Sequence, residues 1–337
     1  MRHTSFRRRA LAIAGLTAAA ALTLSGCSSS SDSAGGDDAA AKSVKIGISQ
    51  FVQHPALDSA TEGFKQAFID AGYVEGETVT FDEQNANAEQ ATAVTIAQGF
   101  ATSDNDLILA VATPAAQAAA QAITDKPIVF TAVTDAVSAE LVDSNDAPGG
   151  NVTGTSDLAP LDEQLKMLQE IVPDAKKVGI VYASGEVNSE VQVKAAEAAA
   201  KDLDIEIVTK TVTTANDIAQ ATEALGDVDA IYVPTDNLVV SGISSLVQVA
   251  EEKKIPVIGA EAGTVEGGAV ATLGIDYTDL GHQTGEMAIK ILKDGADPAE
   301  MPVEVSKSFT YVVNPGAAKR MGVEIPKDIL DQAETVE

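Results

Sequence analysis

Short apolar runs alternate with longer alanine-rich segments along the chain from Val44 onward. The apolar runs are rich in valine and isoleucine and have the length of buried strands, whereas residues 56–71 place Leu57, Phe64 and Phe68 at helical spacing. The pattern predicts strands at 44–48, 79–81, 107–111 and 128–130, and helices at 56–71, 89–101 and 114–123. Apolar strands that alternate with helices are typical of a parallel sheet covered by helices on both faces.

The same order of elements recurs in the second half of the chain. We predict strands at 178–182, 205–208, 230–233 and 256–258, helices at 189–203, 217–225 and 238–250, and then a loop that contains Gly263. Local matches support a duplication, because Asp106 and its strand align with Asp229 and its strand, and Lys126-Pro127 aligns with Ile255-Pro256 at nearly the same offset. The sequence therefore predicts an α/β protein with two Rossmann-like lobes and a ligand cleft between them.

The first 43 residues have a different character. Arg2 and Arg7 to Arg9 precede an apolar stretch, Ala10 to Leu24, which has the length of a signal-peptide core and is too short to span a bilayer comfortably. The stretch ends in Leu24-Ser25-Gly26-Cys27, the lipobox pattern of bacterial lipoproteins. We expect a signal peptide at 1–26, a lipid anchor on Cys27 and a flexible tether over 27–43, rich in Ser, Gly, Asp and Ala.

Two alternatives concern this leader. Cys27 is the only cysteine of the 337 residues, which excludes an intramolecular disulfide and leaves a chance cysteine as the other interpretation of the motif. The small residues before it favour the anchor. The arginines at 7–9 also leave export by the twin-arginine route open beside the general secretory route.

The chain is strongly acidic, with 50 Asp and Glu against 22 Lys and Arg. Removal of residues 1–26 takes away four arginines, so a net charge of −28 becomes −32. Such a charge argues against nucleic acid as a partner, but it describes a solvated surface and identifies no ligand. Roughly 290 residues remain after the tether, which is enough for two domains with sizeable cores.

Small polar residues follow almost every predicted strand. Ligands of parallel sheets lie beyond the carboxyl ends of the strands, where helix N-termini direct backbone N–H groups outward. Each such residue could equally cap a helix, but their recurrence in both halves predicts a binding site. The candidate ligand-binding residues are Ser49, Gln50, Phe51, Thr113, Pro114, Thr131, Thr134, Asp135, Ser156, Asp157, Glu186, Asn188, Ser189, Thr235, Asp236, Asn237, Glu261 and Asp276.

The sequence lacks the usual signs of catalysis. It contains no G-x-S-x-G, H-E-x-x-H, G-x-x-x-x-G-K-[ST] or G-x-G-x-x-G motif, and nothing pairs a nucleophile with a base. His3 lies in the leader, and we expect His54 and His282 to be surface or helix-cap residues. We therefore expect no enzyme activity and no cofactor.

Calcium is the metal that the aspartates would suit. Asp135, Asp157, Asp236 and Asp276 fall on separate loops and lack the ligand spacing of a calcium-binding loop, so we expect no metal site.

The candidate residues suit a small zwitterion. The chain has no tryptophan and only 4% aromatic residues, which argues against a sugar stacked on rings. Hydroxyls and backbone N–H groups can hold a carboxylate, and Asp236 or Glu261 can hold an ammonium group. Asp236 is the favoured partner because the matching turn at 112–114 carries no charge; the alternative is that Asp236 only caps a helix. Phe51, Tyr182 and Tyr277 could supply apolar walls, with core packing as the alternative for Tyr182.

Several motifs together resemble the TrpX-like ABC-transporter substrate-binding lipoproteins. They are residues 48–58 with Gly63-Phe64, 110–117, 129–135, 149–154, 232–237, and 274–277 with Gly281 and Gly285-Glu286. Each motif is weak alone, but their order and spacing over residues 44–324 are specific. The resemblance implies a type I periplasmic-binding fold with a hinge crossed three times. It also implies import of small molecules, with aromatic amino acids bound by some members.

On this basis lobe one would comprise residues 44–154 and 277–300, and lobe two residues 155–276 and 301–324. The crossings would lie near 154–156, 275–276 and 301–304, and the tail 303–313 would complete a sheet edge. We expect a monomeric, membrane-anchored, extracytoplasmic protein that captures an apolar or aromatic amino acid by lobe closure and docks on an ABC permease. A sensing lipoprotein that docks on a receptor, or an extracytoplasmic enzyme, remains the alternative.

Overall fold

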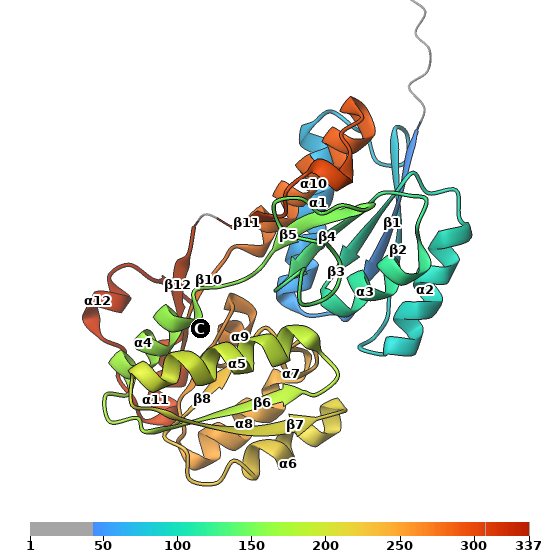
Figure 1. Cartoon of the computed structure of the whole chain (residues 1–337). Helices are drawn as coiled ribbons and strands as arrows, with labels where there is room; N and C mark the ends of the chain where they lie inside the picture. The colour runs from blue at the N-terminus through green and yellow to red at the C-terminus, as the bar shows by residue number, and fades with distance from the viewer. Residues whose placement is uncertain (1–42, 307, 337) are drawn as a thin grey trace, which may run out of the picture. The chain divides into compact units, whose positions relative to one another are not determined.

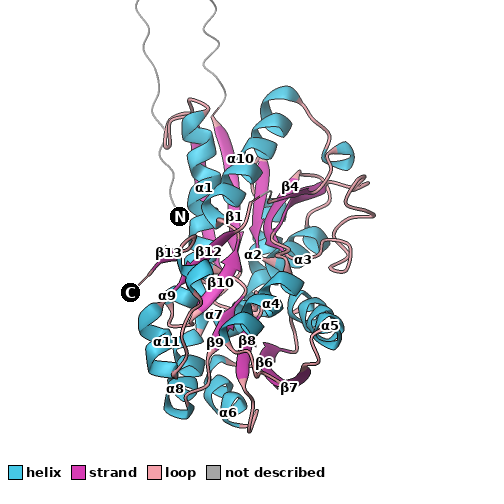
Figure 2. Ribbon diagram, turned by 90° about the vertical axis from the view of Figure 1, so that its left-hand side faces the viewer, coloured by secondary structure: helices cyan, strands magenta, loops and turns pink. Residues whose placement is uncertain are grey.

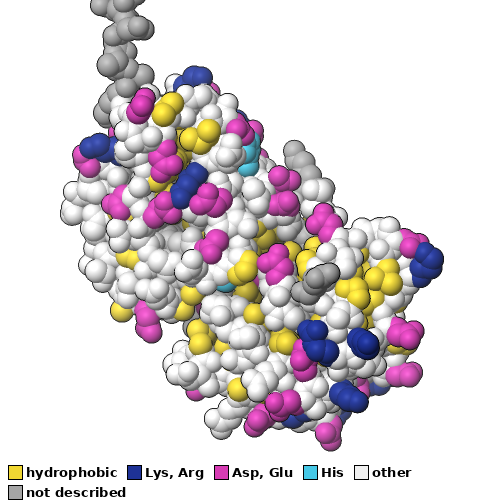
Figure 3. Space-filling model, turned by 180° about the vertical axis from the view of Figure 1, so that it is seen from behind, with side chains coloured by type: hydrophobic (Ala, Val, Ile, Leu, Met, Phe, Trp, Pro, Cys, Tyr) yellow, Lys and Arg dark blue, Asp and Glu magenta, His cyan; other side chains and the backbone are white. Residues whose placement is uncertain are grey.

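The computed structural model of the chain describes residues 43–306 and 308–336 (Figure 1). Residues 42–337 form one compact unit. The expected signal peptide, Cys27 and nearly all of the tether lie outside the described residues. Among the helices that are described, none is both long and apolar enough to cross a membrane. Acidic side chains are spread over both lobes on the face shown in Figure 3, as the net charge of −28 predicts.

The first sheet consists of parallel strands in the order β11-β5-β4-β3-β1-β2. Its strands are β1 (Val44–Gln50), β2 (Val79–Asn85), β3 (Leu107–Val111), β4 (Ile128–Val133), β5 (Val152–Ser156) and β11 (Glu304–Val305). Its helices are α1 (Pro55–Asp70), α2 (Gln90–Thr102), α3 (Thr113–Ala122) and α10 (Tyr277–Asp294). Residues of β3 alternate between two apolar clusters: Leu109 belongs to the one with α1 and α10, and Ile108 to the one with the end of α2 and with α3. Helices therefore cover both faces of this sheet.

The second sheet has the order β13-β12-β10-β9-β8-β6-β7, with β12 antiparallel to β10 (Figure 2). Its strands are β6 (Lys177–Ala183), β7 (Glu206–Val212), β8 (Ala230–Val233), β9 (Val257–Gly259), β10 (Ala271–Gly274), β12 (Thr310–Val313) and β13 (Glu334–Thr335). Its α-helices are α4 (Leu161–Ile171), α5 (Val187–Asp202), α6 (Ile218–Glu223), α7 (Asn237–Ser241), α8 (Ile243–Lys253), α9 (Ala262–Glu266), α11 (Pro315–Met321) and α12 (Lys327–Leu330). Short 3₁₀ turns occupy Ala215–Asp217 and Pro298–Glu300. The predicted α/β class with two parallel-sheet lobes is confirmed.

Two predicted elements differ from the structure. The expected helix at 238–250 is interrupted at Gly242, so that α7 and α8 are separate, and a side chain at this glycine would meet Ile218 at 2.6 Å. The expected loop around Gly263 is the short helix α9, which Glu261 caps by accepting a hydrogen bond from the Gly263 N–H. Both differences arise where a single turn is stabilised by packing or capping, which periodicity does not reveal.

The third connection between the sheets lies later than predicted. The expected crossing at 301–304 is wrong, because Glu304 and Val305 still pair with Thr155 and Ser156 of β5 in the first sheet. Without β11, β5 would be an unpaired edge strand. The second sheet also continues past residue 324, through α12 to β13. The predicted boundary between residues 154 and 155 is also early, because Thr155 and Ser156 belong to β5 of the first sheet, and the boundary at residue 276 stays a prediction.

Helices α1 and α10 approach each other closely because glycines line their contact. A Cβ atom on Gly63 would lie 2.0 Å from the backbone oxygen of Thr278, and one on Gly281 would lie 1.9 Å from that of Ala60. Backbone atoms cannot yield to a methyl group at these distances. This packing holds the beginning of α10, and with it Tyr277, against the first lobe.

We predict that Gly281→Ala lowers the free energy of unfolding by about 2 kcal/mol or more, because the added methyl group must separate the two helices. Gly99→Ala is the matched control: nothing lies within 4 Å of its Cβ position in α2. This control should be neutral or gain about 0.5–1 kcal/mol from the better helix propensity of alanine. Urea unfolding of both variants measures the effect, and equal midpoints would contradict the packing argument.

Candidate ligand-binding site

An enclosed cavity of about 10 Å³ lies between the two lobes, with room for about one water molecule. It is found beyond the carboxyl ends of the strands, where the sequence placed the cleft. The lining residues are His54, Leu57 and Ala132 from the first lobe, Thr235, Asn237, Val240 and Glu261 from the second, and Asp157 and Tyr277 beside the connections. Of the predicted site residues, the cavity thus brings together Asp157, Thr235, Asn237 and Glu261.

One end of this cavity is acidic; we call Asp157, Glu261 and Tyr277 the acidic end. Asp157 accepts hydrogen bonds from the Thr134 hydroxyl at 2.9 Å and the Tyr277 hydroxyl at 2.8 Å. Glu261 Oε2 accepts from the Gly263 N–H at 2.7 Å, while Oε1 is buried without a hydrogen-bond partner among the described residues. Burial raises the pKa of Asp157 and raises that of Glu261 to about 7. No basic side chain other than the neutral His54 lines the cavity, so this end suits an added cation.

The other side chains form an apolar end, in which His54 and Leu57 at the start of α1 share the cavity wall with Asn237 and Val240 at the start of α7. His54 is only 8% exposed, and burial lowers its pKa to about 4 although a hydrogen bond to Asn237 opposes the shift. The imidazole is therefore neutral at physiological pH. The expectation of a surface position is wrong, whereas His54 does occupy the N-cap position of α1, although its side chain makes no cap hydrogen bond.

Direct contacts join the lobes around the cavity. The hydroxyls of Thr134 and Thr235 lie 3.2 Å apart, and the Gln90 amide donates to the Gly185 carbonyl at 3.4 Å. Thr235 is further held by the Gln192 amide, which donates to its hydroxyl at 2.6 Å. These bonds hold the lobes in contact around the cavity.

Asp236 lies next to this cavity but does not line it. Its Oδ1 accepts from the Val239 N–H at 2.8 Å, and its Oδ2 accepts from the Ala183 N–H and the Ser189 hydroxyl, both at 2.6 Å. The carboxylate is therefore saturated as the cap of α7. The geometry favours this cap role, which was the alternative to an ammonium partner.

Glu186 forms a second buried acidic group beside Asp236. Its carboxylate accepts from the side chain of Asn188, from both nitrogens of Asn237 and from the Leu238 N–H. Burial raises the pKa of Glu186 to about 8, with the charge of Asp236 as the second cause, and burial also raises the pKa of Asp236. These hydrogen bonds orient the start of α7, which carries Asn237 and Val240.

Other predicted residues support the two lobes rather than the cavity. Gln50 is engaged with Val52, Asp58 and Thr61 within the first lobe. The remaining members of this group are Phe51 in the apolar core, Thr131 bonded to Thr155, Ser156 bonded to the Thr134 carbonyl, Asp135 closing its own turn, and Asp276 capping α10.

Two buried hydroxyl groups near the start of α3 lack hydrogen-bond partners in the described part of the chain. Ser49 Oγ and Thr113 Oγ1 are buried and have no hydrogen-bond partner among the described residues. Thr113 and Pro114 are the first two residues of α3, and Ser49 lies on the neighbouring strand β1. Unsatisfied buried hydroxyls at a helix N-terminus are suited to an anion.

Sequence reasoning missed His54, Leu57, Ala132 and Val240. His54 with Leu57, and Asn237 with Val240, have the i, i+3 spacing of one helix face, but the pattern cannot show that the two faces meet across a cleft. Ala132 has a positive φ of 56°, at the point where the pairing of β4 with β5 shifts register. Such a bulge is invisible in the apolar run of residues 128–133.

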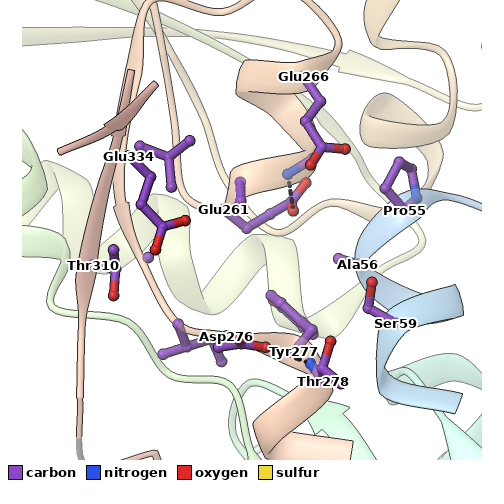
Figure 4. A pocket seen from close by; sticks show the side chains of 15 residues that line it. Pro55, Ala56, Ser59, Glu261, Glu266, Asp276, Tyr277, Thr278, Thr310 and Glu334 are labelled. Atoms are coloured by element: carbon purple, nitrogen blue, oxygen red, sulfur yellow. Dashed lines mark hydrogen bonds between the residues drawn. The ribbon is translucent and has the colours of Figure 1, made fainter. Parts of the chain in front are cut away.

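A larger hollow of about 180 Å³, which we call the hinge-side hollow, opens beside the acidic end, next to the connection between β10 and α10 (Figure 4). Glu261 and Tyr277 line both spaces, and Glu266, Asp276 and Glu334 add three carboxylates to the hollow. No three His, Cys, Asp or Glu side chains among residues 43–306 and 308–336 lie close enough together to hold a metal ion.

A family model described as "ABC transporter substrate binding protein" matches residues 45–337. The chain belongs to this family. The match confirms the resemblance that the sequence motifs indicated. Members of this family are extracytoplasmic substrate-binding proteins, and the two lobes with a cavity between them fit that role.

Relatives within the family include proteins with named ligands. The chain is 42% identical to the tyrosine-binding protein of Clostridioides difficile, over 93% of this chain and 92% of the relative. It is 36% identical to an ABC domain from Streptococcus pneumoniae solved in complex with L-Trp, over 88% and 100% of the two chains, with a TM-score of 0.84.

A third relative is the ligand-free, open structure of a substrate-binding protein with adhesive properties from Clostridium difficile. It is 44% identical over 87% and 99% of the two chains, with a TM-score of 0.67. More distant solute-binding proteins at 14–15% identity share the fold, which confirms the predicted periplasmic-binding architecture.

The buried Glu186 should make the free energy of unfolding of this protein depend on pH. Its folded pKa of about 8 exceeds the ordinary value of 4.5, so its contribution is fully present below about pH 4.5 and is lost as the pH rises to about 8. The slope is at most about 1.4 kcal/mol of unfolding free energy per pH unit. We predict that Glu186→Gln flattens the decline of unfolding free energy between pH 5 and 8, measured by urea unfolding.

Glu190→Gln is the matched control, because Glu190 lies on the same helix α5 with its side chain 48% exposed. It should leave the slope unchanged. A wild-type slope retained in Glu186→Gln would show that Glu186 does not take up the proton.

Proposed function

We propose that this protein captures an aromatic amino acid outside the cell and presents it to an ABC importer. The observation that carries the proposal is the cavity between the lobes, with unpaired carboxylate capacity at one end and apolar walls at the other. The relatives at 42% and 36% identity, which bind tyrosine and L-Trp, support the same ligand class.

The ammonium group of the ligand would lie at the acidic end. Glu261 Oε1 is buried and unpaired, and Asp157 has acceptor capacity left beyond its two hydrogen bonds. A buried carboxylate gains most from a charged donor. The raised pKa of Glu261, about 7, reflects the cost of burying this group without a cation, and an ammonium group would remove that cost.

The carboxylate of the ligand would lie at the start of α3. The Ser49 and Thr113 hydroxyls are unpaired and buried there, and the first N–H groups of this ten-residue helix are available for an anion. These groups belong to the first lobe, whereas Glu261 belongs to the second. A zwitterion would therefore bridge the lobes.

Ligand entry requires the lobes to move. A cavity of about 10 Å³ cannot hold an amino acid, so the lobes must separate for loading and close again on the ligand. The similarity scores support such a motion. The chain matches the L-Trp complex with a TM-score of 0.84 at 36% identity, but the open, ligand-free relative with only 0.67 at 44% identity.

The ligand would be released unchanged. The residues that line the cavity include no serine or cysteine beside a base, and the neutral His54 is bonded to Asn237 rather than to a nucleophile. The family as a whole consists of binding proteins, which supports this view.

We predict that the purified protein binds at least one of L-tyrosine, L-tryptophan and L-phenylalanine at one site and returns it unchanged, as titration calorimetry and mass spectrometry would show. Glu261→Gln should weaken this binding roughly thirtyfold or more, because a buried charge partner is lost. The wild-type affinity should also rise between pH 6 and 8 as Glu261 ionises, given its pKa of about 7.

Glu266→Gln serves as the control. Glu266 lines the hinge-side hollow but not the ligand cavity, so its replacement should change the affinity little. Small-angle scattering of the same wild-type samples should show a smaller radius of gyration with ligand. Absence of binding by all three amino acids would refute the proposal, and an unchanged radius at saturation would refute lobe closure.

The protein would be held at the membrane by a lipid on Cys27. Two acyl chains supply about the hydrophobic contact that stable anchoring needs. We predict that Cys27→Ala abolishes fatty-acid labelling and releases the protein into the medium, measured by metabolic labelling and fractionation. Ser28→Ala is the control and should keep the label. Labelling that persists in Cys27→Ala would exclude this anchor.

A further inference from the structure

His54 has an unused hydrogen-bonding atom inside the ligand cavity. Its Nδ1 is buried and has no hydrogen-bond partner among the described residues, although the side chain lines the cavity. Asn237 is the hydrogen-bonding neighbour of the ring, and with Nδ1 unpartnered we assign its contact to the other ring nitrogen, Nε2. A buried polar atom without a partner is uncommon in native proteins and is expected where a ligand completes the site.

The hydrogen bonds behind Asn237 determine which ring nitrogen carries the proton. Glu186 Oε2 receives the Asn188 amide, the Asn237 backbone N–H and Asn237 Nδ2. With three donors converging on it, this oxygen accepts in both protonation states of Glu186. Asn237 Nδ2 is thus committed to Glu186, and its Oδ1 is the atom left for His54.

An amide oxygen can only accept a hydrogen bond, so His54 Nε2 must donate to it. The ring is neutral, because burial lowers its pKa to about 4. A neutral imidazole carries one proton, and Nδ1 is therefore a bare acceptor. The chain from Glu186 through Asn237 to His54 thus crosses from the second lobe to the first and sets the tautomer.

The neighbouring polar groups at this end are already occupied. The Thr235 hydroxyl accepts from Gln192 and contacts Thr134 across the lobes. Leu57 and Val240 are apolar. Among the described residues that line the apolar end, His54 Nδ1 is the one fully buried side-chain polar atom without a hydrogen-bond partner.

We propose that His54 Nδ1 selects aromatic amino acids that carry a hydrogen-bond donor on the ring. This inference rests on the proposed function, in which the ammonium group lies at the acidic end. The aromatic ring then extends to the apolar end, where a tyrosine hydroxyl or a tryptophan indole N–H donates to His54. Phenylalanine offers no donor and leaves Nδ1 buried without a partner.

The physical basis of the selection is the cost of an unpaired acceptor. A site built to hydrogen-bond a ligand group discriminates strongly against an analogue that lacks the group, because its buried polar atom stays unsatisfied. The two relatives with named ligands bind tyrosine and L-Trp, both of which carry a donor on the ring. We expect tyrosine or tryptophan to bind roughly tenfold or more tightly than phenylalanine.

Calorimetric titration of wild-type protein and His54→Leu with the three amino acids tests the assignment. His54→Leu should bring the best of tyrosine and tryptophan to within about threefold of phenylalanine, by weakening the donor-bearing ligand. His54→Asn, which restores an acceptor oxygen near the Nδ1 position, should recover part of the preference. Melting curves of both variants check that they are folded. If His54→Leu is unstable, His54→Asn still tests the assignment.

Val240→Ala is the matched control, since it removes apolar contact from the same end of the cavity. It should weaken all three ligands and leave their ratio unchanged. Two outcomes would overturn the role of His54 and leave the proposed function intact. One is a wild-type protein that binds phenylalanine as tightly as tyrosine and tryptophan. The other is a preference for tyrosine or tryptophan that survives in both His54 variants. Failure of all three amino acids to bind overturns the proposed function itself.

Discussion

Four carboxyl groups are buried next to the surface between the lobes, and none takes part in an ion pair of the described residues: Asp157, Glu186, Asp236 and Glu261. Burying a charge without compensation is costly, and each of these carboxyls accepts at least one hydrogen bond from a helix start, a hydroxyl or an amide. These bonds determine where α7 and α9 begin, and the bond to Asp157 holds the Tyr277 hydroxyl at the start of α10. The helices in turn place Asn237, Val240 and Tyr277 on the cavity wall.

The four groups differ in what remains available to a ligand. Neighbouring donors occupy the carboxyl oxygens of Asp236 and Glu186, and these hydrogen bonds stabilise the second lobe. Glu261 keeps an unpaired oxygen, and Asp157 is shared between Thr134 and Tyr277 at the connection of the lobes. Asp236 and Glu186 are therefore compensated within the protein, whereas Asp157 and Glu261 remain suited to a cation from outside.

Much of the fold and part of the site follow from local patterns. The strands at 107–111 and 230–233 lie at their predicted bounds. Each is a short, uninterrupted run of apolar residues, which is the pattern of a fully buried strand. Asp157, Thr235, Asn237 and Glu261, which line the cavity, were among the predicted residues because they follow strands of parallel sheets. Asp236 satisfies the same rule and nevertheless does not line the cavity, since the rule concerns the edge of a sheet and not the direction of a side chain.

The sequence alone determined the class of fold, the duplication and the edge of the sheets at which the cavity lies, because periodicity and chain order encode secondary structure and topology. The tertiary structure decided which side chains meet there. His54 had no local sign of its place on the cavity wall: its ring is buried at the start of α1, where it shares the wall with Asn237 and Val240 of α7. Such properties depend on contacts between residues far apart in the chain, and no local pattern carries them.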